Sequence, residues 1–172
     1  MFTIWLTGLS GAGKTTLSAL LAEELCRKGY KLELLDGDQL RGGISRDLGY
    51  GKEDRIKQVQ RVGYLCELLN KHGVVTIVSL ISPYRDSREV LRTKIKHFVE
   101  VYMKCPLETL LGRDPKGLYK KALAGEIKSF TGISDPYEEP LRPEITVFSD
   151  QETPHQGCEK VLQRLLELEL ID

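Results

Sequence analysis

The feature that most constrains this fold is a glycine-rich segment, Gly8 to Thr15, that follows an apolar run and precedes a helical pattern. It reads GLSGAGKT and matches the spacing GxxxxGK[ST] of a P-loop. In this motif backbone N–H groups turn inward around phosphate oxygens, at the positive end of the following helix dipole. We therefore expect Lys14 to reach the outer phosphates of a nucleoside triphosphate and the Thr15 hydroxyl to bind Mg²⁺.

Short apolar runs alternate with helical patterns along the rest of the chain. Because strands that alternate with helices form parallel sheets through right-handed crossovers, this pattern predicts an α/β fold. The expected class is the P-loop NTPase fold, with a five-stranded parallel sheet, helices on both faces and a basic lid segment. The expected strands are 2–7, 31–35, 74–80, 98–103 and 145–148, and the expected helices are 14–27, 53–71, 86–96, 107–111 and 154–170. Residues 39–50 are too broken by glycine for a long regular element.

Length and composition favour a single neutral domain over residues 1–172. Lysine and arginine together number 25, as do aspartate and glutamate, so the chain lacks the basic excess of proteins that bind nucleic acid or anionic membranes. The four cysteines are scattered without a CxxC pair, which favours reduced structural thiols over a metal site or a disulfide framework. Since no apolar run approaches the ~20 residues of a membrane span, the sequence predicts a soluble, cytoplasmic protein.

Two acidic residues, Asp36 and Asp38, follow the second predicted strand and flank a glycine. They lie at the sheet edge where open α/β proteins place their chemistry, and Arg41 and other groups able to hold an anion come next. A solvated turn is the alternative explanation. The position beside a P-loop favours a catalytic carboxylate, because a kinase needs one next to the phosphates.

A basic stretch interrupts this neutral chain at residues 113–129, where five lysines and arginines accompany two acidic residues. A solvated helix face would explain such charge. The other explanation is a lid, approximately residues 113–135, that closes cations over a polyphosphate and excludes water. Phe130 comes next to a flexible segment containing glycine, where a base could stack.

Motifs that are missing narrow the class of reaction. A switch GTPase would carry an NKxD-like segment and a DxxG at a strand end, and neither occurs. A motor or AAA-type ATPase would be longer and would carry a hydrophobic strand ending in Asp-Glu. The P-loop, the acid pair, the arginines and the basic stretch together indicate a small-molecule kinase.

Blocks of the sequence between Thr3 and Glu139 resemble the adenylylsulfate kinase family in order and spacing. They are GLSGAGKTT, LDGDQLR, RDLGY, EDR, ISPYR, DPKGLYKKA, AGEIK and FTGISDPYE. The resemblance implies that the γ-phosphate of ATP passes, with Mg²⁺, to the 3′-hydroxyl of adenosine 5′-phosphosulfate, giving 3′-phosphoadenosine 5′-phosphosulfate and ADP. It also implies a small-molecule acceptor, a homodimer and a possible association with an ATP sulfurylase.

The resemblance implies a role for each matching position. Lys14 and Asp38 would be catalytic, with Asp38 the base or orienter of the 3′-hydroxyl, and Ser82 matches a serine sometimes assigned as a phosphoserine intermediate. Direct in-line transfer is favoured here, because phosphoryl transfer needs positioning and charge stabilisation more than a protein nucleophile. Mg²⁺ would be held by Thr15 and, with its waters, by Asp36. ATP would contact Gly8, Leu9, Ser10, Gly11, Ala12, Gly13, Lys14, Thr15, Thr16 and Arg113. The acceptor would contact Asp38, Arg41, Tyr50, Arg55, Gln58, Ile81, Ser82, Lys116 and Phe130, with Tyr50 and Phe130 on the two faces of its adenine.

Four positions depart from the usual pattern of that family. Gln58 replaces an asparagine, Gln60 an arginine, and Tyr50 and Leu80 phenylalanines. These changes leave the ATP chemistry intact and bear on the affinity for the acceptor and on its identity.

Two other functions remain open from the sequence. One is a kinase for a different nucleotide-like or sugar hydroxyl, which would not need the Tyr50–Phe130 pair. The other is an ATP-binding regulatory or inactive domain that assembles with a sulfate-activating partner, which acceptor-stimulated ATP turnover would exclude.

Overall fold

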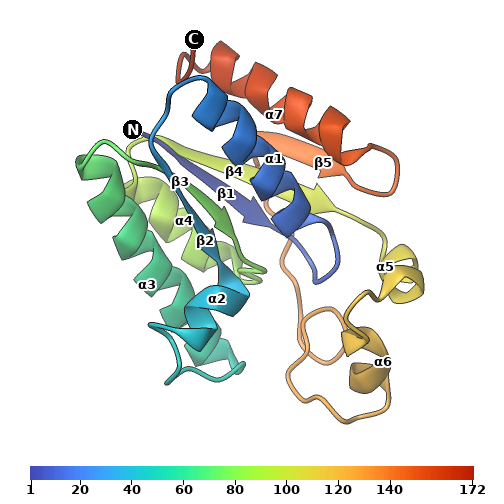
Figure 1. Cartoon of the computed structure of the whole chain (residues 1–172). Coiled ribbons are helices and arrows are strands. Elements are labelled where there is room, and N and C mark those ends of the chain that lie inside the picture. The colour runs from blue at the N-terminus through green and yellow to red at the C-terminus, as the bar shows by residue number, and fades with distance from the viewer.

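The computed structural model describes residues 1–172 and confirms the α/β fold (Figure 1). Five parallel strands form the sheet in the order β2-β3-β1-β4-β5. They are β1 (Thr3–Thr7), β2 (Leu32–Asp36), β3 (Val75–Ser79), β4 (Phe98–Lys104) and β5 (Ile145–Phe148). The helices are α1 (Lys14–Arg27), α2 (Gly37–Gly42), α3 (Lys52–Lys71), α4 (Arg85–Lys94), α5 (Leu107–Arg113), α6 (Leu118–Leu123) and α7 (Pro154–Glu167).

All the predicted elements are present, together with two short helices that were not among them. The helix α6 lies in the basic stretch 113–129, and α2 lies where the sequence predicted an irregular segment. The Asp36 side chain explains why a helix begins at α2. Its carboxylate accepts a hydrogen bond from the Asp38 N–H at 3.0 Å and caps the N-terminus of α2. The cap compensates for glycine at both ends of this short helix.

Helices cover both faces of the sheet and form two hydrophobic clusters. On one face α1 and α7 pack over the sheet, with Leu21 and Val161 in the larger cluster. On the other face α3 and α4 pack near Trp5 of β1. These two helices approach closely at Gly63, where an added Cβ would lie 2.2 Å from a methyl carbon of Leu91. The close crossing therefore depends on a glycine in α3.

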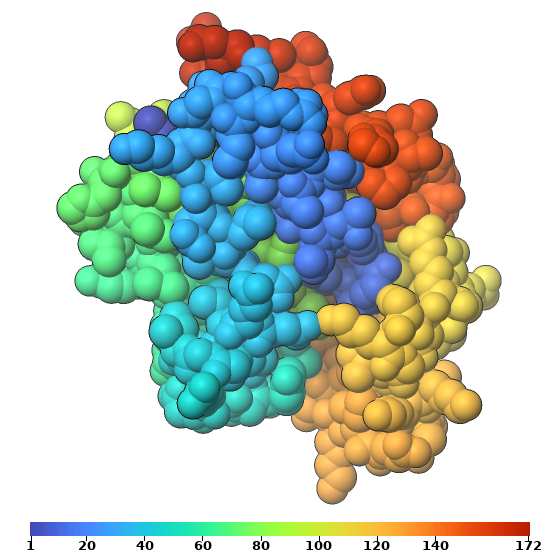
Figure 2. All heavy atoms as spheres, viewed as in Figure 1, coloured from blue at the N-terminus to red at the C-terminus, as the bar shows by residue number.

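The connections that follow β1 and β3 leave the sheet on opposite faces, because β1 leads to α1 and β3 leads to α4. Neighbouring parallel strands with this arrangement open a crevice at their carboxyl ends. The P-loop lies on one side of it and residues 80–84 on the other. In Figure 2 residues 113–135, the segment predicted to be a lid (the lid segment), lie in yellow and orange and face α2 and the loop after it, in cyan, across a hollow.

After the lid, residues 136–144 return to the sheet. They pass over β4 on the same face as α3 and α4, where those two helices leave the strand uncovered. Tyr137 stacks on Tyr102 of β4, with ring centroids 5.9 Å apart, and Glu144 accepts a hydrogen bond from the Glu100 N–H. The Glu138 N–H donates to the Pro83 carbonyl at 2.8 Å. The end of the lid is thus attached to the crevice. None of the helices has both the length and the apolar character needed to span a lipid bilayer.

Candidate active site

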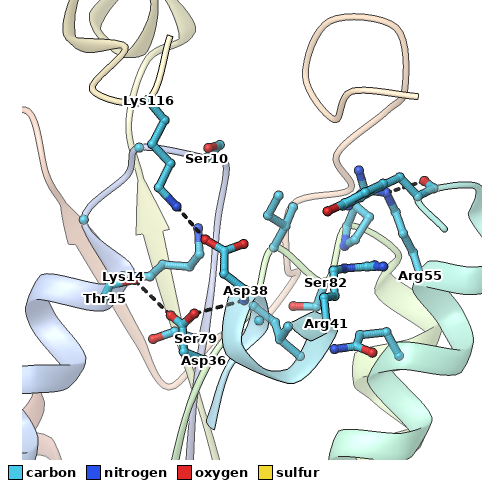
Figure 3. A pocket seen from close by; sticks show the side chains of 18 of the residues that line it. Ser10, Lys14, Thr15, Asp36, Asp38, Arg41, Arg55, Ser79, Ser82 and Lys116 are labelled. Carbon is cyan, nitrogen blue, oxygen red and sulfur yellow. Dashed lines mark hydrogen bonds and ion pairs between the residues drawn. The ribbon is translucent and has the colours of Figure 1, made fainter. Parts of the chain in front are cut away.

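A cleft of about 340 Å³ opens at the crevice, between the P-loop, α2, the start of α3, the segment after β3 and the lid (Figure 3). Most of the residues predicted for the site line it. They are Ser10, Gly11, Gly13, Lys14, Thr15, Thr16, Asp36, Asp38, Arg41, Tyr50, Arg55, Gln58, Ile81, Ser82 and Lys116. The structure therefore brings the predicted ATP and acceptor residues into one cavity.

The P-loop has the backbone geometry of an anion site. Gly8 has a φ of 153°, and a Cβ there would lie 2.6 Å from the Met103 carbonyl oxygen, so the loop passes directly against β4. The N–H groups of Gly13, Lys14 and Thr15 donate to no group of the chain. Free N–H groups at the start of α1 are what a phosphate requires.

Lys14 lies against the inside of this loop. Its ammonium group donates to the carbonyl oxygens of Gly8 and Leu9, at 2.9 and 2.8 Å, and forms no ion pair. Burial lowers the pKa of Lys14 to about 8, although Asp36 opposes the shift. A bound phosphate would supply the negative charge that this lysine lacks.

Thr15 and Asp36 place two oxygen groups side by side below the P-loop. The Thr15 hydroxyl donates to Asp36 Oδ2 at 3.1 Å. Ser79, at the end of β3, pairs in register with Asp36, and its buried hydroxyl has no hydrogen-bond partner. Hydroxyl and carboxylate oxygens suit Mg²⁺ and its waters, so the residues present fit this ion. Ser79 was not among the residues predicted for the site, although its place at the carboxyl end of a predicted strand was a usable signal.

Asp38 forms an ion pair with Lys116 that bridges the mouth of the cleft. The Lys116 ammonium lies 2.6 Å from Asp38 Oδ2, and a dashed line marks this pair in Figure 3. The hydrogen bond raises the pKa of Lys116. Both side chains are more than half exposed. An exposed pair of this kind is typically worth less than about 1 kcal/mol, so a ligand can displace it easily.

The far half of the cleft holds two arginines without carboxylate partners. Arg55 is buried and donates to the carbonyl oxygens of Tyr50 and Ser129, at 2.8 and 3.0 Å. Arg41 donates to the Gly49 carbonyl at 2.6 Å, and its guanidinium carbon lies 4.3 Å from the Tyr50 ring centroid. Burial and the nearby Arg41 charge lower the pKa of Arg55. Two cations that form no ion pair favour an anionic ligand in this half of the cleft.

Gln58 lies beside these arginines with its side chain 2% exposed. Neither its amide oxygen nor its amide nitrogen has a hydrogen-bond partner within the chain. A buried donor or acceptor left unpaired costs roughly 1–3 kcal/mol, so this amide is arranged to meet a ligand or water. Gln58, which stands where the family it resembles usually has an asparagine, therefore still presents a side-chain amide at the cleft.

Five of the predicted residues do not line the cleft, namely Gly8, Leu9 and Ala12 of the P-loop, Phe130 and Arg113. Phe130 is 8% exposed and packs in the core, edge to face with Tyr119 at 5.0 Å, so it does not face Tyr50 in this structure. The sequence pointed to an aromatic next to a glycine, and local pattern could not show that Tyr119 would draw the ring inward. Arg113 lies at the end of α5 and donates to the Ser149 carbonyl at 2.7 Å.

Comparison with known proteins agrees with this geometry. The family model described as Adenylylsulphate kinase matches residues 1–148. The chain belongs to the adenylylsulfate kinase family. It is 54% identical over 166 residues to the adenylyl-sulfate kinase of Rippkaea orientalis. The aligned region covers 96% of this chain and 92% of the relative. A further relative, the probable bifunctional SAT/APS kinase 2 of Sorangium cellulosum, is 49% identical over 97% of this chain and 29% of its own length.

The solved structures include a similar member of this family. The Mycobacterium tuberculosis APS kinase CysC in complex with AMPPNP and APS superposes with a TM-score of 0.90 at 39% identity, covering 96% of this chain and 97% of that one. The family therefore accounts for the fold, the P-loop and the kinase chemistry that the sequence predicted.

Proposed function

We propose that this adenylylsulfate kinase family member transfers the γ-phosphate of ATP to the 3′-hydroxyl of adenosine 5′-phosphosulfate. The observation that carries the proposal is the pair of arginines, Arg41 and Arg55, which lack carboxylate partners and face the P-loop across Asp38 in one cleft. An acceptor with a phosphosulfate group supplies the negative charge that these arginines lack. The relative of known structure that holds AMPPNP and APS together supports the same pairing of ligands.

At the ATP end, the phosphates would take the place of the carbonyl groups that now bind Lys14. The free N–H groups of the P-loop would then hold phosphate oxygens. Mg²⁺, held through Thr15 and Asp36, would neutralise charge on the outer phosphates. Lys14 and Thr16 complete the set of P-loop side chains that face this half of the cleft.

At the acceptor end, Asp38 would accept a hydrogen bond from the 3′-hydroxyl and direct its oxygen at the γ-phosphorus. A bond forms between the 3′-oxygen and phosphorus while the bond from phosphorus to the β,γ-bridging oxygen breaks, and ADP leaves. The hydroxyl proton passes to Asp38. Lys116 would exchange Asp38 for phosphate oxygens as the lid closes, which frees the carboxylate and adds positive charge.

We infer direct transfer without a phosphoserine. The Ser82 side chain is buried, and its hydroxyl already binds the Trp5 indole N–H at 3.0 Å and Thr7 Oγ1 at 3.0 Å. A nucleophile would have to leave both contacts. Ile81 and Ser82 are instead proposed to line the acceptor site.

Tyr50 is proposed to stack on the acceptor adenine. In this structure Arg41 covers one face of its ring, so the base would replace that guanidinium. The second aromatic of the predicted pair, Phe130, would reach the base only by leaving the core against Tyr119. Arg113 is proposed to contact ATP after exchanging its Ser149 contact.

An assay of ADP release with Mg²⁺ and ATP tests the function directly. Adenosine 5′-phosphosulfate, adenosine 5′-monophosphate and no acceptor would be compared at equal concentrations. Turnover that depends on the phosphosulfate is the expected result. Equal turnover with the monophosphate would contradict the acceptor assignment, and ATP binding without turnover would indicate the regulatory or inactive alternative.

We also propose a cytoplasmic location, a homodimer and association with an ATP sulfurylase. The family resemblance supports the dimer, and the bifunctional relative supports the association. Light scattering on the purified chain alone would measure whether it is a dimer. The same measurement with an ATP sulfurylase added would measure whether the two proteins associate.

A further inference from the structure

Arg88 of α4 is a buried cation that lies outside the cleft. Its side chain is 1% exposed, as is that of Glu100 on β4, which accepts a hydrogen bond from Arg88 Nε at 2.7 Å. Glu100 also pairs with Arg92, and Arg92 pairs with Glu144. The buried charges are therefore balanced within one cluster, and the chemistry described above uses none of them.

The two remaining nitrogens of Arg88 bind backbone carbonyls from two different segments. Nη1 donates to the Ser82 carbonyl in the segment after β3, and Nη2 donates to the Glu138 carbonyl at 2.6 Å in the segment that returns from the lid. One planar guanidinium thus connects β4, the segment after β3 that lines the cleft, and the segment that returns from the lid. A lysine could not reproduce these contacts, because its ammonium is a single point of charge.

Ser82 has a backbone conformation that needs such support. Its φ is 41°, in the left-handed region that a residue with a Cβ rarely adopts. Its hydroxyl is occupied by Trp5 and Thr7, and its carbonyl by Arg88. The backbone N–H is the one hydrogen-bonding group of Ser82 without a partner in the chain. Since Ser82 lines the cleft, this N–H is the group left for a ligand.

We propose that Arg88 is a positioning residue for the acceptor. It holds Ser82 in the left-handed conformation, so that the backbone N–H of Ser82 rather than its hydroxyl meets an anionic group of the acceptor. Arg88 itself touches no substrate, and it also fixes the end of the lid through Glu138. The inference rests on the proposed function only for the identity of the acceptor.

The kinetic test compares Arg88→Lys with Arg92→Met. Arg92 contacts the same Glu100 but no residue of the cleft, so its substitution reports a disturbance of the Glu100 charge cluster without any change in a contact to the cleft. We expect Arg88→Lys to raise the KM for adenosine 5′-phosphosulfate by about tenfold or more, with the KM for ATP changed less than about twofold. Arg92→Met should lower the melting temperature and leave both KM values within about twofold. An unchanged acceptor KM in Arg88→Lys, or an equal rise in both variants, would overturn the proposal.

A second measurement does not depend on turnover. In amide NMR spectra without ligands, Arg88→Lys should shift the Ser82 resonance and leave those of the P-loop in place, whereas Arg92→Met should leave the Ser82 resonance unmoved. A Ser82 resonance that is the same in Arg88→Lys as in the wild type would overturn the positioning role even if the acceptor is not adenosine 5′-phosphosulfate. Absence of wild-type turnover together with a shifted Ser82 amide would refute the proposed function and retain the role of Arg88.

Discussion

Asp36 and Asp38 are two residues apart in the sequence, and their carboxylates make different contacts. Asp36 caps α2 and bonds to Thr15, so its carboxylate is committed to the fold and to the ATP half of the cleft. Asp38 has only the exposed contact with Lys116. This difference supports the proton-accepting role proposed for Asp38, because a base has to give up its partner when the substrate arrives.

Replacement of Asp38 by asparagine tests that assignment. The amide keeps the size of the side chain and removes the proton acceptor, so kcat should fall by about 10²- to 10⁴-fold while the dissociation constant for ATP changes little. Steady-state kinetics and calorimetric titration with ATP measure the two effects. Asp47→Asn is the matched control, because Asp47 pairs with Arg61 outside the cleft. Near-normal turnover in Asp38→Asn would refute the role.

Lys14 makes ATP binding depend on pH. Its pKa in the ligand-free protein is lowered to about 8 from 10.5, and bound phosphates favour the charged form. Above pH 8 binding must therefore take up a proton, so affinity should fall by up to about tenfold per pH unit. The stability of the free protein moves the other way. Because the unfolded chain holds this proton more tightly, stability should rise as the pH increases from about 8 to 10.5.

Calorimetry in two buffers of different ionisation enthalpy would count the protons taken up with ATP. Lys14→Arg supplies the control, since a guanidinium stays charged throughout this range and should remove the pH dependence. Proton uptake that is equally absent in the wild type and in Lys14→Arg would show that the Lys14 pKa is not lowered.

The placement of single residues in the cleft was largely predictable from spacing, and their burial was not. The P-loop, Asp36 and Asp38 follow strands whose carboxyl ends share one edge, so the sequence was enough to bring them together. Gln58 was predicted from the family pattern, but its isolation from every polar partner appears only when α3 is packed. Phe130 was predicted to face a base and instead joins the core, because long-range packing with Tyr119 decides its position.

At the level of elements, hydrophobic periodicity predicted the regular helices and the strands. It did not predict α2, which begins at a capping side chain and not at a periodic pattern. Residues 14–27 and 145–148 were predicted with the limits that α1 and β5 have. The short helix α2 was missed because one capping carboxylate outweighs the low helix propensity of its glycines. The crossing of α3 and α4 likewise depends on one residue, Gly63.

Substitution of Gly63 by alanine should weaken this crossing. Alanine favours a helix by about 0.5–1 kcal/mol, whereas overpacking a core costs about 1–3 kcal/mol, so the contact with Leu91 should outweigh the gain and stability should fall. Urea denaturation measures the change. Gly112→Ala in α5 is the control, because a Cβ there meets nothing within 4 Å, and its stability should rise. The double substitution Gly63→Ala with Leu91→Ala should show coupling, and strict additivity would contradict the steric explanation.

At the level of the whole molecule, the cleft is built from parts with different attachments to the sheet. The P-loop and the segment after β3 continue directly from central strands. The lid is attached by the core packing of Tyr119 and Phe130, by the bond from Arg55 to the Ser129 carbonyl, at its far end through Glu138, and across the mouth through Lys116 and Asp38. Of these attachments the surface ion pair is the weak one, so the mouth of the cleft is where ligands can rearrange the lid at small cost.

Limited digestion with trypsin should follow that rearrangement. The lid exposes Lys120, Lys121 and Lys128, and an exposed site at Lys71, the last residue of α3, serves as an internal standard. AMPPNP alone should slow cleavage in the lid modestly. AMPPNP with adenosine 5′-phosphosulfate should slow it much further relative to Lys71, because the acceptor then fills the other half of the cleft and adds anionic oxygens that Lys116 can bind in place of Asp38. Lys116→Ala should reduce the difference between the two conditions. If both conditions protected the lid and Lys71 equally, ligands would be stabilising the whole fold and not closing the lid.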